Sequence, residues 1–104
     1  MKILNTTTTV PTPPTTQLPI RQRLKGHTLT VEMSAEEAWF ILACVRRVDG
    51  GRFNSIRQYE TPIAEAITSV LAKIMGRETA LDMTDNGISG LSGTLTAKPF
   101  DENP

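Results

Sequence analysis

The amino-acid sequence predicts an α+β fold in which two helices pack on a small, mostly antiparallel sheet, preceded by an extended Thr/Pro-rich N-terminal arm. Three observations indicate this class. Residues 29–33 alternate apolar and polar side chains, two later stretches repeat apolar residues at helical spacing, and residues 5–19 are mostly threonine and proline. We therefore expect an arm at residues 1–19 and a single α+β domain at residues 20–104.

The arm contains a low-complexity segment, NTTTTVPTPPTTQLP, at residues 5–19. Its prolines exclude a helix, so we expect an extended or polyproline-like chain with little apolar area to bury. Three interpretations stay open: a disordered tail, an arm laid over a neighbouring subunit of an assembly, or a proline-rich ligand motif between Pro11 and Pro14.

Two stretches after the arm alternate in character. In residues 20–25 the alternation is loose, with Ile20 and Leu24 on one side and basic side chains on the other. In residues 29–33 it is strict, because apolar residues share one face and polar residues share the other. We expect a half-buried strand at residues 29–33 and a less regular strand at residues 20–25.

A capping box at Ser34 and Glu37 predicts the start of the first long helix. The helix should run to about Val48, with an apolar stripe made of Ala38, Ile41, Leu42, Val45 and Val48. Neighbouring apolar residues widen this stripe around most of the helix. Such a helix needs a second covering surface, either from the sheet and the other helix or from a second copy of the chain.

The second helix is expected to take Thr61 as its N-cap and Pro62 as its first residue, and to end at Gly76. Its apolar stripe consists of Ile63, Ile67, Val70, Leu71 and Ile74. Ile56 and Tyr59 continue the spacing backward, so either a short helical turn before Pro62 or one kinked helix from Ser55 is possible. After it we expect strands at residues 79–84 and 93–100, joined through a turn at residues 85–87.

Four arginines surround a pair of glycines between the two helices. Glycine lets the backbone approach a ligand closely, and arginine offers a planar fork to phosphate or carboxylate. One interpretation is a solvated turn with helix-end charges. The other is an anion site for a nucleotide, a phosphate backbone or an acidic partner, and its candidate residues are Arg46, Arg47, Arg52 and Arg57.

Catalytic and metal motifs find no support in the sequence. Cys44 and His27 are the only residues of their kinds, so a disulfide or a zinc cluster within one chain is not expected. Cys44 is interpreted as a small core residue and His27 as a surface strand residue. A calcium loop at residues 82–87 lacks the required acids. We therefore expect no enzyme, no cofactor and no metal site.

Charge and composition limit the possible partners. The formal net charge is zero, yet the basic residues gather between Arg21 and Arg57 while the acids dominate after Tyr59. This layout favours head-to-tail contacts or a local anion site, and it argues against nucleic acid as a partner. With 38% hydrophobic residues the chain can build only a lean core, so we expect a homo-oligomer.

Neither a secretory signal nor a membrane span is expected. The apolar run at the start stops at Asn5, and no stretch reaches the roughly 18 apolar residues that a membrane span needs. A single cysteine fits a protein of a reducing compartment.

The stretch LTVEMSAEEAWFILACVRRVDGG, followed by SIRQYETPIAEAITSVL, resembles a style of small bacteriophage protein. In these proteins a threonine-rich strand leads through a Ser/Thr-x-x-Glu cap into a helix, a Gly/Ser/Arg loop and a second helix. The resemblance covers about half of the chain. It implies a phage accessory protein, and such proteins often block host defence, some by sequestering signalling nucleotides in an oligomer. It transfers no functional residue, and the Thr/Pro arm departs from the pattern.

Two functions are therefore expected. The first is a non-enzymatic binding protein of the host cytoplasm that captures an anionic, nucleotide-like ligand or a host partner as an oligomer and could thereby counteract host defence. The alternative is a virion structural or assembly protein whose N-terminal arm clamps a neighbouring subunit.

Overall fold

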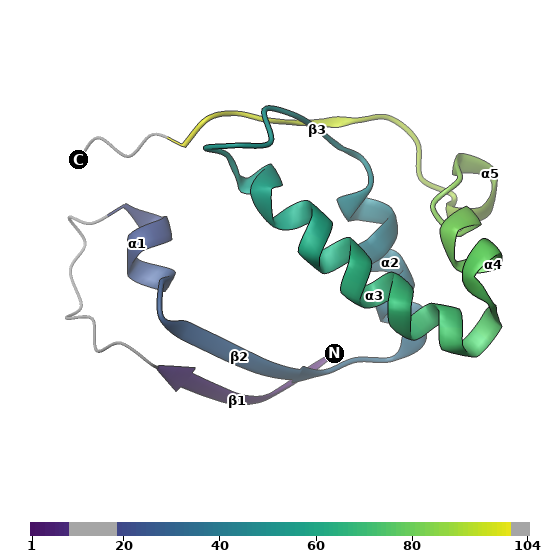
Figure 1. The fold of residues 1–104 in the computed structure, drawn as a ribbon, viewed down its shortest axis with the longest axis horizontal. Helices are drawn as coiled ribbons and strands as arrows, with labels where there is room; N and C mark the ends of the chain where they lie inside the picture. Colours follow the sequence, from purple (N-terminus) through teal and green to yellow (C-terminus); the bar gives the residue numbers. More distant parts are fainter. Residues whose placement is uncertain (9–18, 101–104) are drawn as a thin grey trace. The chain divides into compact units, whose positions relative to one another are not determined.

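The computed structural model describes residues 1–8 and 19–100 (Figure 1). These residues confirm the α+β class. They fall into two compact units, one within Met1–Met33 and one formed by Ser34–Phe100. The expected division into an arm and one domain at Ile20 stays a prediction. Most of the expected arm, residues 9–18, lies outside the described residues, as does the whole of the proline-rich motif.

The first unit contains two antiparallel strands, β1 (Lys2–Thr8) and β2 (His27–Glu32). The register runs from Lys2 opposite Glu32 to Thr8 opposite His27, with an irregularity between Ile3 and Asn5. The expected strand over residues 29–33 is thus present, but every residue of β2 is exposed, so the expected half-burial is wrong. The threonines that follow Asn5 extend β1, because β-branched residues suit a pleated strand.

Helix α1 (Ile20–Leu24) corrects the expectation of a strand over residues 20–25. The Pro19 carbonyl accepts hydrogen bonds from the amides of Gln22 and Arg23, at 3.0 and 3.1 Å. Proline fixes a backbone angle that suits the start of a helix and needs no donor there. The loose alternation of this stretch was too short to separate a strand from a single helical turn.

The second unit begins with α2 (Ala35–Val45), and its expected capping box is present. The Glu37 amide donates to Ser34 Oγ at 3.0 Å, and the Ser34 amide donates to Glu37 Oε1 at 2.9 Å. The helix ends before the expected Val48, which instead begins strand β3 (Val48–Gly50).

Helix α3 (Glu60–Met75) follows a short 3-10 helix, η1 (Ile56–Tyr59). Of the two open alternatives, the short helical turn before Pro62 is therefore the one observed. The N-cap is Tyr59 rather than Thr61, and Pro62 lies inside the first turn. Proline is tolerated there because the first four amides of a helix have no partner within it. Gly76 ends the helix as expected, with a φ of 90°.

The C-terminal expectations need correction. Residues 79–84 are not a strand, because helix α4 (Arg77–Asp82) occupies most of them. The expected turn at residues 85–87 leads into a further helical turn, α5 (Asn86–Ser89). The last expected strand shrinks to β4 (Leu95–Ala97), which pairs in parallel with β3.

Helices build the core of the second unit, since α3 packs against both α2 and α4. The core cluster contains buried side chains from all three helices and from the residue after α4, and they are Leu42, Ala64, Leu71, Ala80 and Met83. The Trp39 indole packs against this core and donates to the Met83 carbonyl at 2.9 Å. Ala64 and Ala80 let the helices approach closely because their side chains are small.

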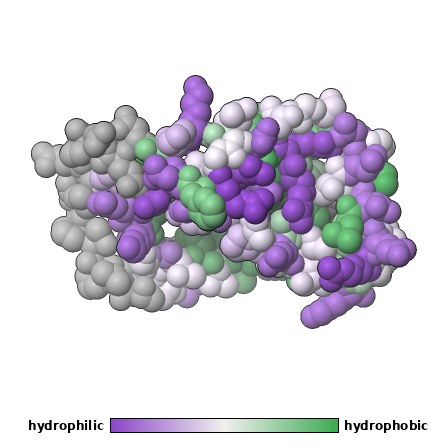
Figure 2. All heavy atoms as spheres, turned by 45° about the horizontal axis from the view of Figure 1, so that its top comes forward, coloured by the Kyte–Doolittle hydropathy of each residue, from purple (hydrophilic) through white to green (hydrophobic). Residues whose placement is uncertain are grey.

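Much of the apolar surface stays outside this core. Of the expected α3 stripe only Leu71 is fully buried, while Ile63, Val70 and Ile74 remain exposed. Figure 2 shows hydrophobic residues, in green, interleaved with hydrophilic ones, in purple, on the face in view. None of the described helices has the length and apolar character that would let it cross a membrane.

Candidate functional site

Arg57, one of the four candidate arginines, holds the glycine loop together from inside. Its Nε donates to Glu60 Oε2 at 3.0 Å, and its Nη1 donates to the Gly50 carbonyl and lies 3.7 Å from Asp49 Oδ1. The Glu60 side chain is only 9% exposed, so this ion pair is largely shielded from water. Arg57 therefore donates its hydrogen bonds to groups of its own chain, Glu60 and Gly50.

Ser55 completes the same loop. Its side chain is fully buried, and its Oγ donates to the Gly51 carbonyl and accepts from the Arg57 amide at 3.2 Å. Strand pairing also fixes Gly50, whose φ is 102° and whose Cα faces the Ala97 backbone so closely that a Cβ would overlap the Ala97 carbonyl oxygen. The loop is thus a closed structural turn.

Arg47 points away from the loop, toward the segment between α4 and α5. Its Nη2 donates to the Thr84 carbonyl at 2.8 Å and to Ser89 Oγ at 3.3 Å. Its Nε is buried without a hydrogen-bond partner. Arg47 ties the end of α2 to the C-terminal half of the unit, and this is a structural role.

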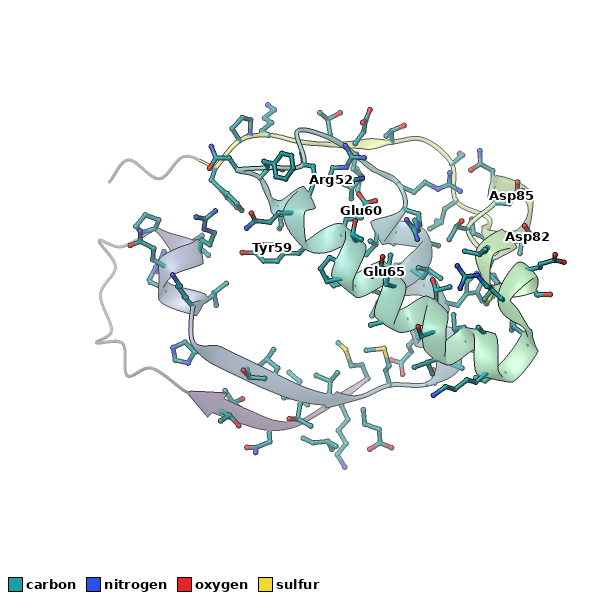
Figure 3. The ribbon with its side chains drawn as sticks, viewed as in Figure 1. Arg52, Tyr59, Glu60, Glu65, Asp82 and Asp85 are labelled. Atoms are coloured by element: carbon teal, nitrogen blue, oxygen red, sulfur yellow. The ribbon has the colours of Figure 1, made fainter. Side chains whose placement is uncertain are left out.

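Arg46 and Arg52 are the two candidates that keep an accessible charge. Arg46 is the C-cap of α2, and its Nη1 lies 4.0 Å from Glu60 Oε1 with 38% of the side chain exposed. Arg52 is exposed at the loop (Figure 3), and within the described part of the chain it makes no hydrogen bond or ion pair. The four arginines therefore do not converge on one ligand position.

A groove beside α3 gathers a different set of basic residues. It has a volume of about 640 Å³, and it is lined by Arg46, Glu65, Thr68, Ser69, Ala72, Lys73, Arg77 and Leu81. The lining therefore comes from the end of α2, one side of α3, and α4. Figure 3 shows Glu65 on this helix, about one turn beyond Glu60.

The chemistry of this groove suits an anion. The lining contains three cations, Arg46, Lys73 and Arg77, and one carboxylate, that of Glu65. The hydroxyls of Thr68 and Ser69 add neutral donors. Among the residues that the structure describes, Lys73 and Arg77 have no hydrogen-bond or ion-pair partner. Their donors thus remain available for an external oxygen acceptor.

Sequence reasoning found Arg46 but missed Lys73 and Arg77. A signal was present, since polar residues recur every four positions at Glu65, Ser69, Lys73 and Arg77. Residues four apart share one face of a helix, so the spacing predicts a polar stripe from Glu65 to Lys73, whereas Arg77 belongs to the next helix. Gly76, between Lys73 and Arg77, ends the helix, so the sequence did not indicate that Arg77 lies beside Lys73.

No described group of three His, Cys, Asp or Glu side chains could hold a metal ion. Cys44 is a free thiol of intermediate burial on α2. Comparison of the chain with protein-family models, with curated proteins and with solved structures finds no match in any of the three. The groove and its charges are therefore the basis on which a function can be argued.

Proposed function

We propose that this protein is a non-enzymatic binding protein that captures a phosphate-bearing, nucleotide-like ligand in the groove beside α3. The observation that carries the proposal is the gathering of Arg46, Lys73 and Arg77 around a groove of about 640 Å³. Ligand pockets usually have volumes of about 300–1,000 Å³, so the groove has room for a nucleotide.

Each part of the groove has a role in this proposal. The guanidinium groups of Arg46 and Arg77 offer paired donors to phosphate oxygens, and Lys73 adds a compact positive charge. Ser69 supplies a hydroxyl to the same oxygens. The Glu65 carboxylate accepts from a sugar hydroxyl or an exocyclic amine. The apolar side chains of the lining provide a surface for the flat face of a base.

The resemblance to small bacteriophage proteins supports a biological setting for this capture. We propose that the chain acts in the cytoplasm of an infected host, where removal of a signalling nucleotide would blunt a defence response. The alternative, virion assembly through the N-terminal arm, gains less support, because the first part of that arm pairs with β2 of its own chain.

Calorimetric titration of the full chain against inorganic phosphate, mononucleotides and cyclic dinucleotides tests the proposal. The double variant Lys73→Gln with Arg77→Gln should weaken binding of the best ligand at least about tenfold, because it removes two charge-assisted contacts. Wild-type affinity should also fall as salt rises, since the groove is open to solvent. The matched control is Arg52→Gln with Lys98→Gln, which removes two exposed cations outside the groove.

The control pair also separates the two candidate sites. If the Arg52→Gln pair abolishes binding and the groove pair leaves it intact, the ligand sits at the glycine loop and the groove proposal is wrong. Failure of every phosphate compound to bind the wild-type chain would equally overturn it.

A further inference from the structure

A row of large apolar side chains runs along the outer side of η1 and α3. The row consists of Ile56, Tyr59, Ile63, Val70 and Ile74, each between 41% and 64% exposed. Their spacing of three, four or seven residues keeps them on one side of a helix. Figure 3 shows Tyr59 projecting from the start of α3.

This outer row is separate from the two other surfaces that α3 uses. Ala64 and Leu71 point into the core against the neighbouring helices, and both are buried. Glu65 and Ser69 line the groove. At about 100° per residue the outer row lies between these two sides, so α3 keeps an apolar face that the rest of its own unit, Ser34–Phe100, does not cover.

The exposed area is large for a chain of this size. Five large side chains, each roughly half exposed, present on the order of 400–500 Å² of apolar surface. Two such faces brought together would bury about 1,000 Å², which is the threshold for a specific interface. Because the core of the helical unit is small, burial of this further apolar area would add substantially to its stability.

We propose that a second copy of this chain covers the row, with the two α3 helices packed antiparallel about a two-fold axis near Ala66. A two-fold interface requires a patch that is complementary to itself. The row meets this requirement, because the pairing sets Tyr59 against Ile74 of the second copy and Ile63 against Val70. Ala66 lies exposed near the axis, where a small side chain lets two helices approach closely.

The charges of α3 favour the antiparallel direction. Because Glu60 is shielded and paired with Arg57, the exposed charges of α3 are Glu65 in its first half and Lys73 near its end. Antiparallel packing brings ends of opposite charge together and also opposes the two helix dipoles. Parallel packing would place Lys73 beside its own copy, which is unfavourable.

Light scattering of the full chain tests this pairing. The wild type should have twice the 11.4 kDa mass of one chain. Ile74→Glu should raise the dissociation constant of the dimer at least about tenfold, because it buries a charge within an apolar contact. Ile88→Glu is the matched control, since Ile88 is similarly exposed on α5 but lies outside the row. Trp39 fluorescence verifies that both variants remain folded.

Cysteine crosslinking tests the two-fold axis itself. In a Cys44→Ser background, Ala66→Cys should form a disulfide-linked dimer under mild oxidation, and Ala35→Cys at the start of α2 should not. A wild-type mass of a single chain overturns the proposal. So does a dimer that survives Ile74→Glu, or a dimer in which the Ala66→Cys variant crosslinks no better than the Ala35→Cys control.

Discussion

The glycine loop and the groove beside α3 are both rich in basic side chains, yet they use their charges in opposite ways. In the loop, Arg57 donates to Glu60 and to the Gly50 carbonyl, and Arg47, just before it, donates to the Thr84 carbonyl. In the groove, Lys73 and Arg77 have no such partner among the described residues. Arg57 and Arg47 thus use their donors within the fold, whereas Lys73 and Arg77 remain accessible; Arg52 of the loop stays exposed, and Arg46 of the groove lies 4.0 Å from Glu60.

A cluster of arginines in a sequence is therefore not by itself an anion site. A guanidinium group has five donors, and a nearby carboxylate or carbonyl satisfies them before a ligand can. The loop supplies both kinds of acceptor within a few residues of Arg57. Within α3 no acid follows Glu65, so Lys73 has no carboxylate within one helical turn.

Gly50→Ala should cause the largest effect and tests whether the loop is purely structural. The substitution places a Cβ against the Ala97 carbonyl at a φ of 102°, so we expect the free energy of unfolding to fall by about 3 kcal/mol or more. Urea denaturation followed by Trp39 fluorescence measures it. Gly51→Ala is the matched control, because its Cβ would meet only the Phe53 carbonyl oxygen, at 3.9 Å. Equal stability of the two variants would mean that the loop tolerates rearrangement and could adapt to a ligand.

Arg57→Ala should cause the second-largest effect, a fall of about 2–3 kcal/mol in the free energy of unfolding. The change leaves the shielded Glu60 carboxylate with only the contact to Arg46 at 4.0 Å, and an uncompensated charge of this kind is costly. Adding Glu60→Gln to Arg57→Ala should restore about 1 kcal/mol in the same denaturation experiment, because the carboxylate no longer needs a partner. If Arg57→Ala leaves the free energy of unfolding unchanged, the Arg57 side chain does not stabilise the fold and is again a candidate ligand-binding residue.

Local chemistry accounts for the features that the sequence predicts well. Ser34 and Glu37 are three residues apart, and their capping box depends on nothing beyond that spacing. Gly76 ends α3 for a similarly local reason, since glycine readily adopts its positive φ. The existence of both long helices and of the strand over residues 29–33 follows from periodicity alone.

Tertiary contacts decide what the sequence could not show. Helix α4 has only six residues, and its identity rests on the burial of Ala80 against the core. Lys73 and Arg77 join one groove only because the chain turns at Gly76, and spacing does not fix that geometry. The partners of Arg57 likewise depend on how the loop folds back. Arg46 alone was predicted as a site residue and also lines the groove.

The groove pair, Lys73→Gln with Arg77→Gln, should cause the smallest change in stability and completes the comparison. Neither side chain has a partner to lose within the described residues, so the free energy of unfolding should stay within about 0.5 kcal/mol of the wild type. Addition of the tightest-binding phosphate compound should then stabilise the wild type more than the double variant. At a ligand concentration about 100 times the wild-type dissociation constant the wild type gains about 2.7 kcal/mol, and the double variant, with an affinity at least roughly tenfold weaker, should gain no more than about 1.4 kcal/mol. Thermal denaturation with and without ligand measures both effects. A double variant that is already destabilised without ligand would show that the groove cations, like the loop arginines, serve the fold.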